Sequence, residues 1–411
     1  MSENNEKTEM LAGNMHDYIF WRGDLKFSQS EFNEVDNLIL CKLSMMDLGE
    51  IQIPDEGISF SELKPVYLEK YGDEENLGLI LNIGIINLFK DVADSARFSE
   101  VRVMNYVNKI DKVEEVQFSA TLYDLNDGTR YLAYKGTDDT IIGFKEDFNM
   151  IVYESVPAQE DAKLFLQDLC SHYKGQLRIG GHSKGGNLSV YAAKSVSPEI
   201  QDQIVKIYNN DGPGFKNSIS EEEGYKRIKD KIINIVPEYS IVGVLLNQLE
   251  NLDVVKCSAK GLAAHNGFTW RVMGPRFIRA EGLASSSQIF DKALKEIEDN
   301  LGIEEKKEFN DILFDMLFST GADTLKELYE NGVWENLKTL KFFSGEERKK
   351  VLEPTMMLIK EYFKEAGEVI PDKVKDKLPE SAVEAVKHPI KTIEKAIRGN
   401  EAGVSKTKAE S

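Results

Sequence analysis

The pattern of apolar and polar residues changes twice along the chain. Up to residue 71 apolar positions recur at helical spacing, most clearly over residues 33–48, and the pattern predicts a further helix at 99–110. From 116 to 258, short runs rich in β-branched and aromatic residues alternate with helical segments. Beyond about residue 285 only charged, amphipathic helical patterns remain. The chain is therefore predicted to have a helical beginning, a mixed middle and a helical end.

The middle part predicts an α/β domain with a mainly parallel sheet, because its strands alternate with helices. The expected strands are 116–123, 130–134, 177–180, 204–209, 231–236 and 254–258, and the expected helices include 159–173 and 184–195. Asn126-Asp127-Gly128 lies between the first two strands and is typical of a hairpin turn.

These patterns suggest four segments. Residues 1–12 and 399–411 are polar and are predicted to be disordered tails, residues 13–280 form the α/β domain, and residues 281–398 form a helical C-terminal region. The apolar run from Leu77 to Phe89 contains two asparagines. At about a dozen residues it is too short to span a bilayer, so a buried helix is expected there.

Composition narrows the class of protein. The 411 residues are 41% hydrophobic and 29% charged, which suits a globular protein, and the net charge of −19 disfavours binding to nucleic acid. The three cysteines are far apart, which argues against a disulfide framework or a zinc site. No secretory signal is visible at the N-terminus. A cytoplasmic protein without a metal or cofactor is expected, and the oligomeric state is left open.

A candidate nucleophile stands out at Ser183. It is the centre of a Gly-x-Ser-x-Gly motif within Gly-Gly-His-Ser-Lys-Gly-Gly-Asn, with an apolar strand before it and a helix after it. A strand that reverses sharply into a helix strains its turn residue and needs glycines around it. The backbone N–H of Lys184, at the start of that helix, is suited to donate to an oxyanion.

A serine nucleophile needs a base, and the base needs an acid to orient it. In this strand–turn–helix context the chain order is Ser, acid, His. His265 lies in a loop after the last apolar strand, whereas His388 lies in the charged tail, so His265 is the candidate base. Two carboxylates follow successive strands, and Asp211 is preferred over Glu238 as the acid. Thr137, in a Gly-Thr turn after a strand, is a candidate second oxyanion donor.

Three blocks resemble the class 3, fungal-type triacylglycerol lipases. Residues 134–137 and 143–148 resemble their Arg-Gly-Thr strand and the Trp-x-x-Asp-Leu block after it, residues 181–186 are similar to their Gly-His-Ser-Leu-Gly-Gly elbow, and His265 with residues 268–270 resembles their histidine loop. The resemblance implies an α/β-hydrolase fold. It also supports Thr137 and Lys184 as oxyanion donors.

A closer resemblance is to a bacterial family of lipase-like proteins of undefined function. It rests on residues 17–24, 32–36, 211–215 and 237–243 in addition to the elbow, and covers about residues 15–275. Two departures matter. Class 3 lipases have an aspartate where this chain reads near Ser240, and an apolar residue where it has Lys184.

Three functions fit these residues. The first is cleavage of a small-molecule or lipid acyl ester, and the second is a thioesterase, acyltransferase or amidase on the same triad, since the triad specifies acyl transfer and not the substrate. The third is a catalytically silent scaffold with a partner-binding helical C-terminus. A lid, if one exists, is expected at residues 215–229, which are polar and rich in glutamate.

Overall fold

The computed structural model describes residues 12–73, 84–288, 290–291, 295 and 302–330. Both predicted tails lie outside this range, apart from residue 12, and so does most of the predicted helical region 281–398. The start of the apolar run at 77–89 is outside it too. The domain boundary predicted near residue 280 stays a prediction.

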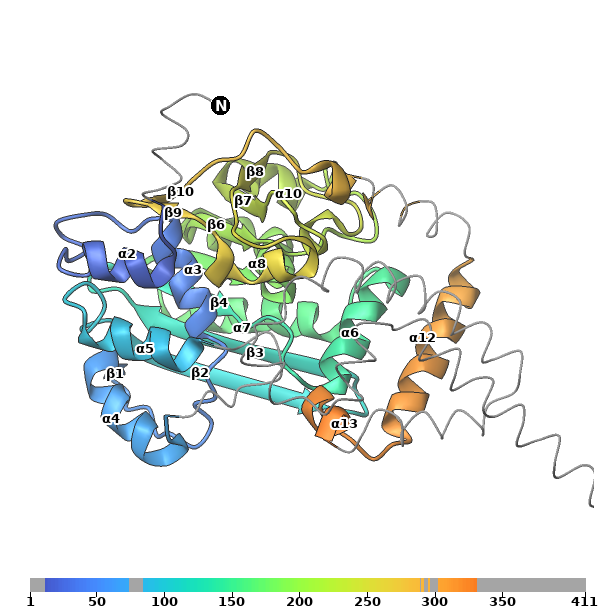
Figure 1. The fold of residues 1–411 in the computed structure, drawn as a ribbon, viewed down its shortest axis with the longest axis horizontal. Helices are drawn as coiled ribbons and strands as arrows, with labels where there is room; N and C mark the ends of the chain where they lie inside the picture. Colours follow the sequence, from blue (N-terminus) through green and yellow to red (C-terminus); the bar gives the residue numbers. More distant parts are fainter. Residues whose placement is uncertain (1–11, 74–83, 289, 292–294, 296–301, 331–411) are drawn as a thin grey trace, which may run out of the picture.

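The fold is built on an eight-stranded sheet whose strands follow their order in the chain (Figure 1). The strands are β1 (Ile58–Ser59), β2 (Arg102–Asp111), β3 (Val116–Asp124), β4 (Thr129–Tyr134), β5 (Gln176–His182), β6 (Ile204–Asn210), β7 (Ile232–Pro237) and β8 (Leu252–Val255). β1 to β4 pair antiparallel, and β4 to β8 pair parallel.

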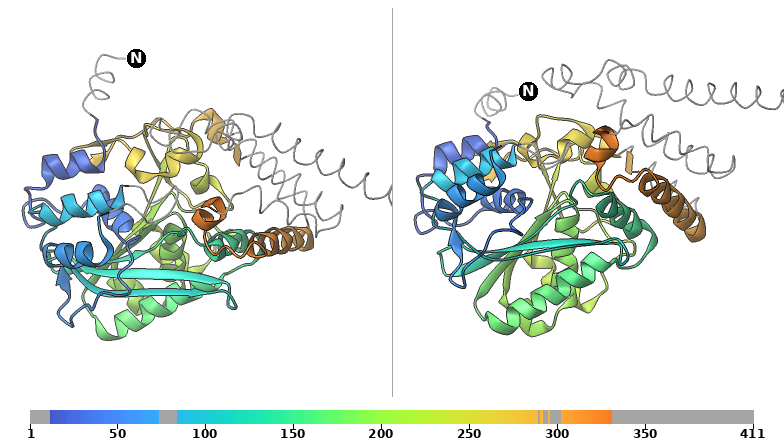
Figure 2. Two further views of the ribbon diagram at one scale, coloured as in Figure 1. Left: turned by 60° about the horizontal axis from the view of Figure 1, so that its bottom comes forward. Right: turned by 90° about the horizontal axis from the view of Figure 1, so that it is seen from below.

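Helices cover both faces of the sheet (Figure 2). They are α2 (Met15–Arg22), α3 (Glu34–Leu43), α4 (Phe60–Tyr71), α5 (Ile85–Asp94), α6 (Ile141–Val152), α7 (Pro157–His172), α8 (Lys184–Ser195), α9 (Pro198–Gln203), α10 (Glu223–Ile228), α12 (Ile303–Phe318) and α13 (Leu325–Glu330). Short 3-10 helices η1 (Lys229–Lys231), η2 (Val242–Val244), η3 (Gly261–His265) and η4 (Gly267–Thr269) and a small ribbon of β9 (Val272–Met273) and β10 (Arg276–Phe277) complete the described chain.

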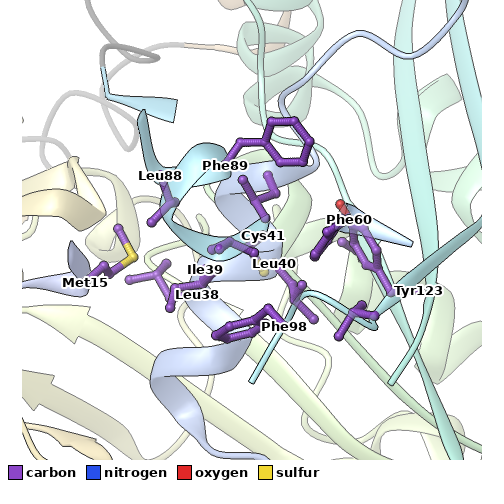
Figure 3. Packing of buried hydrophobic residues seen from close by; sticks show 14 of the residues in the cluster. Met15, Leu38, Ile39, Leu40, Cys41, Phe60, Leu88, Phe89, Phe98 and Tyr123 are labelled. Atoms are coloured by element: carbon purple, nitrogen blue, oxygen red, sulfur yellow. The ribbon is translucent and has the colours of Figure 1, made fainter. Parts of the chain in front are cut away.

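The sheet separates two hydrophobic cores, because successive residues of a strand point to opposite faces. In β4, Tyr131 and Ala133 belong to one core, whereas Leu132 and Tyr134 belong to the other. The first core is closed by α2 to α5, and Figure 3 shows part of its packing around α3. The second is closed by α7, α8 and α10. A largely parallel sheet between two helical layers is the α/β-hydrolase architecture, as the sequence predicted.

Local signals located most elements well. The predicted helix 184–195 is α8 to the residue, and the predicted hairpin joins β3 to β4 with Asn126 and Gly128 at positive φ. The last strand of the sheet lies earlier than the predicted 254–258. β8 ends at Val255, and Cys257 forms an isolated bridge to Trp270.

The helix predicted at residues 99–110 is wrong. Residues 102–111 form strand β2, which pairs along its length with β3. Val101 and Val103 are buried on either side of the half-buried Arg102, a pattern with period two. Long antiparallel pairing with a neighbouring strand decided the conformation of a segment whose own pattern is ambiguous.

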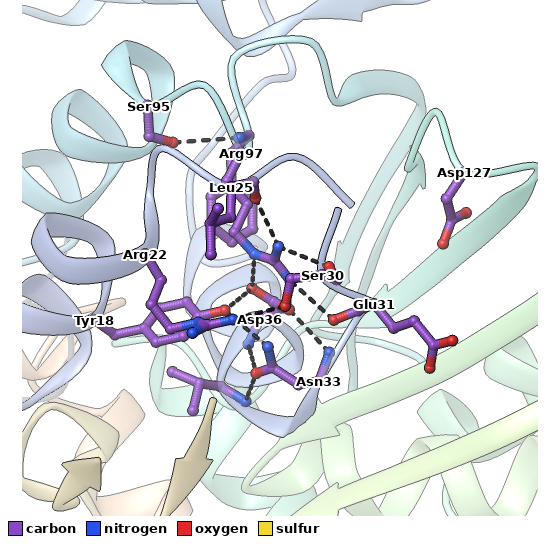
Figure 4. A network of polar contacts seen from close by, with 12 residues as sticks. Tyr18, Arg22, Leu25, Ser30, Glu31, Asn33, Asp36, Ser95, Arg97 and Asp127 are labelled. Atoms are coloured by element: carbon purple, nitrogen blue, oxygen red, sulfur yellow. Dashed lines mark hydrogen bonds and ion pairs between the residues drawn. The ribbon is translucent and has the colours of Figure 1, made fainter. Parts of the chain in front are cut away.

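A buried polar network fixes the N-terminal helices to one another (Figure 4). Asp36 of α3 forms a fully buried ion pair with Arg97. The Nε of Arg97 lies 2.7 Å from Oδ1 of Asp36, and its Nη2 lies 2.5 Å from Oδ2. The hydroxyl of Tyr18 in α2 donates to the same carboxylate at 2.7 Å. Arg97 also donates to the backbone carbonyls of Leu25 and Ser30. The N-terminal blocks noted in the sequence therefore carry structural residues.

None of the helices in the described ranges has both the length and the apolar character needed to cross a membrane.

Candidate active site

Ser183 lies at the sharp turn between β5 and α8. Its backbone is at φ 60° and ψ −132°, a strained conformation for a residue other than glycine. A Cβ added to Gly181 would lie 2.1 Å from the backbone of Gly185, and one on Gly185 would lie 2.1 Å from the carbonyl oxygen of Tyr134. Only glycines allow the strand, the turn and the helix to pack this closely, and the half-buried serine stands at the carboxyl edge of the sheet.

Asp211 and His265 are brought together at the same edge. Asp211 directly follows β6, His265 ends η3, and the Nδ1 of His265 lies 2.6 Å from Oδ2 of Asp211. Both side chains are buried. Asp211 itself has φ 51°, a left-handed conformation that aspartate tolerates better than most residues.

The second carboxylate oxygen of Asp211 is also hydrogen-bonded. Its Oδ1 accepts a hydrogen bond from the hydroxyl of Ser240 at 2.5 Å and from the backbone N–H of Gly243 at 3.1 Å. Gly243 donates to the Ser240 oxygen as well, at 3.0 Å. These hydrogen bonds fix the orientation of the Asp211 carboxylate toward His265.

Glu238, the alternative acid, lies elsewhere. It follows β7, and its Oε1 accepts a hydrogen bond of 3.4 Å from the backbone N–H of Cys257. In the described part of the chain it makes no hydrogen bond to His265, so the structure brings only Asp211 of the two candidates to the histidine.

His182 supports the position of His265. The Nε2–H of His182 donates to the carbonyl oxygen of His265 at 2.7 Å, and the two rings are 4.5 Å apart between centroids. Burial, the neighbouring imidazole and Lys42 hold the pKa of His182 well below its usual value. The indole of Trp270 donates to the carbonyl of Ala264 and fixes the same turn.

The hydroxyl of Ser183 makes no hydrogen bond to His265 among the residues that the structure describes. Catalytic hydrogen bonds are often loose in the absence of substrate and tighten in the complex. The serine and the Asp211–His265 pair nevertheless share one edge of the sheet, since His182 precedes the serine and contacts His265 directly.

Thr137 follows β4, next to the elbow. A Cβ on the preceding Gly136 would lie 2.7 Å from the carbonyl oxygen of His182, so the two turns approach closely. The Thr137 hydroxyl donates to Oδ2 of Asp147 in α6 at 2.6 Å. The other oxygen of Asp147 is buried and has no partner within the described residues. Burial raises the pKa of Asp147 to about 6, although Lys184 and the Thr137 hydrogen bond act in the opposite direction.

The side chain of Lys184 is buried between β3 and α6. Its Nζ donates to the carbonyl oxygen of Gln117 at 2.8 Å and to the Oε1 of the same residue at 2.6 Å, and lies 3.0 Å from Oε2 of Glu146. Lys184 and Glu146 are both buried, so this is a buried ion pair with all three ammonium hydrogens used. The backbone N–H of Lys184 is at the first position of α8, where a helix offers no carbonyl to accept it.

Sequence reasoning assigned no role to three of these residues. His182 contacts His265, Ser240 contacts Asp211, and Asp147 contacts Thr137. Each lies inside a block that the sequence analysis quoted, but a motif does not show which distant side chain its members contact.

The fold and the site together define a lipase-like α/β-hydrolase scaffold. Residues 92–315 match the family model described as Mbeg1-like, and the chain belongs to that lipase-like family. A comparison with curated proteins finds no match. Among solved structures the chain is similar to one titled "Crystal structure of M37 lipase", with 15% identity, over 53% of this chain and 71% of that chain, at a TM-score of 0.35.

Proposed function

We propose that this protein is a serine hydrolase that cleaves an acyl ester, with Ser183 as nucleophile, His265 as general base and Asp211 as the acid. The observation that carries the proposal is the buried 2.6 Å hydrogen bond between Asp211 and His265, beside a serine in a strained elbow. A carboxylate on Nδ1 fixes the tautomer in which Nε2 is free to accept a proton.

In the proposed reaction Oγ of Ser183 attacks the carbonyl carbon while its proton passes to Nε2 of His265. Collapse of the tetrahedral intermediate breaks the bond to the leaving alcohol, which takes the proton from His265. Water then attacks the acyl enzyme in the same way, with His265 first accepting and then returning a proton. Asp211 remains ionised and stabilises the imidazolium throughout.

The oxyanion is proposed to bind between the backbone N–H groups of Lys184 and Thr137. One such donor typically contributes about 3–4 kcal/mol in the transition state. The Thr137 hydroxyl is tied to Asp147, which orients the turn that carries the second N–H. The substrate is proposed to be a small-molecule or lipid ester, and no cofactor takes part.

The test is labelling of the purified protein with a fluorophosphonate probe beside Ser183→Ala. We expect labelling of the wild type and none of the variant, since the probe reacts only with an activated serine. An ester and thioester panel then identifies the acyl substrate. A wild-type protein that stays unlabelled would favour the silent scaffold. A matched control is Ser189→Ala, because Ser189 is a fully buried serine on the same helix whose hydroxyl is already bonded to the carbonyl oxygens of Gly186 and Tyr208.

A further inference from the structure

The chain that follows Thr137 is paired with a segment from the C-terminal region. Thr140 and Thr324 form an isolated antiparallel bridge. The N–H of Ile141 donates to the carbonyl oxygen of Asp323 at 2.9 Å, and the N–H of Leu325 donates to that of Asp139 at 2.9 Å. These backbone bonds begin two residues after the proposed oxyanion donor.

Side chains reinforce the same contact. Oδ2 of Asp139 accepts a hydrogen bond from the N–H of Lys326 at 3.0 Å, and Lys112 pairs with Asp323. Asp138 caps the turn locally by accepting hydrogen bonds from the backbone and hydroxyl of Thr140. The residues between Thr137 and α6 are thus held on one side by residues 323–326, which we call the C-terminal strap.

Helix α12, which leads into the strap, packs on α6 (Figures 1 and 2). Phe314 is buried and its ring meets that of Phe148 at 5.5 Å between centroids, and Asn310 donates to Asn149 at 2.6 Å. Ile141 and Ala322 are buried in the same small core. The helix that carries Asp147, the partner of Thr137, is therefore covered by the C-terminal region.

We propose that the C-terminal strap positions the oxyanion turn, so that this described segment of the C-terminal region contributes to the acyl-transfer site. The inference rests on the proposed function. The turn from Lys135 to Thr140 lies outside the strands and helices, and the strap supplies two backbone hydrogen bonds that limit its motion. Asp147 restrains Thr137 from one side and the strap restrains the following residues from the other.

The experiment compares Leu325→Pro with Leu325→Ala in the full chain. Both lose the leucine side chain, but only proline removes the N–H that donates to Asp139. Leu325 is the first residue of α13, a position where proline is well tolerated. The readouts are the rate of fluorophosphonate labelling of Ser183, the kcat and KM for an ester found in the panel, and the thermal unfolding midpoint.

We expect Leu325→Pro to be labelled roughly tenfold more slowly than Leu325→Ala, with a matching fall in kcat and little change in KM, because a small misplacement of a catalytic group is costly. The two unfolding midpoints should agree within a few degrees. Equal labelling of the two variants, or faster labelling of the proline variant, would overturn the inference and leave the proposed function intact. A wild-type chain that is not labelled would instead remove the proposed function and this inference with it.

A second pair of variants tests the inference without a proline, in case Leu325→Pro misfolds. Asn310→Ala removes the hydrogen bond to Asn149 on α6, and Glu304→Ala alters α12 at an exposed residue whose side chain pairs with Lys307 of the same helix. We expect slower labelling for Asn310→Ala than for Glu304→Ala. Identical rates in this pair would also count against the strap.

Discussion

At the scale of single residues, the proposed acid Asp211 departs from the class 3 lipase pattern that the sequence resembles. Asp211 follows β6, one strand earlier than the aspartate of class 3 lipases, and Ser240 stands near that later position. The serine donates its hydroxyl to Asp211, so the later strand still contributes a group to the same carboxylate. Both groups reach this carboxylate because the carboxyl ends of neighbouring parallel strands meet at one edge of the sheet.

The two carboxylates should differ sharply in their effect on activity. Asp211→Asn is expected to lower kcat by about 10⁴-fold, because an amide allows the wrong tautomer of His265. Glu238→Gln should stay near the wild-type rate, since within the described chain the Glu238 side chain accepts a hydrogen bond from the backbone N–H of Cys257 and none from His265. Steady-state hydrolysis of an ester substrate measures both. A large loss in Glu238→Gln with an active Asp211→Asn would reverse the assignment.

At the scale of elements, a buried ion pair connects α8, the helix after Ser183, to α6, the helix after Thr137. Lys184 begins α8, and its partner Glu146 lies in α6. Glu146 also accepts hydrogen bonds from the backbone of Gln117 in β3 at 3.0 Å and of Ala158 in α7 at 2.8 Å. One carboxylate thus connects four elements around the site, with both oxygens used.

Breaking this pair should destabilise the protein strongly. Lys184→Met is expected to lower the free energy of unfolding by about 3–5 kcal/mol, because it leaves the Glu146 charge buried without its partner. The double variant Lys184→Met/Glu146→Gln should lose less than the sum of the single losses, since neither charge then remains. Urea denaturation of the four proteins gives the coupling energy.

The control for that cycle is a partly exposed ion pair. Lys163 pairs with Glu160 on α7 with 29% and 44% of their side chains exposed, and pairs in contact with water contribute about 0–1 kcal/mol, so Lys163→Met should change little. If Lys184→Met cost no more than Lys163→Met, the buried pair would not be structurally important.

At the scale of the whole molecule, the N-terminal helices belong to the same folding unit as the hydrolase sheet. The family model begins at residue 92, yet residues of α2 to α5 share one core with strands β3, β4, β6, β7 and β8. Leu38, Phe60 and Phe89 are buried within it. These helices pack on one face of the sheet (Figure 2).

A chain that starts at residue 92 should therefore fail to fold. Each buried leucine or phenylalanine side chain contributes about 1.5–3 kcal/mol, and several such losses exceed the 5–15 kcal/mol that separates folded from unfolded domains. Soluble yield and cooperative thermal unfolding are the measurements. A chain that starts at residue 12 keeps every described contact of these helices and is the control. Cooperative unfolding of the shorter chain would show that the family region is independent.

The sequence by itself determined the local features of this protein. The Gly-x-Ser-x-Gly turn, the helix at 184–195, the hairpin around Asn126 and the alternation of strands and helices were all predictable. They depend on turn chemistry and on apolar periodicity, which act between residues close in the chain. An α/β domain with a mainly parallel sheet followed from their order, and the lipase resemblance implied the α/β-hydrolase fold.

Only the tertiary structure decided the long-range contacts. It placed Asp211 and not Glu238 beside His265, which is 54 residues further along the chain, and it turned residues 102–111 into a strand. It also laid the C-terminal segment against the turn after Thr137. The physical reason is the same in each case: a side chain or a strand edge finds its partner through the packing of the whole sheet, and no local pattern encodes which of several chemically suitable partners lies within hydrogen-bonding distance.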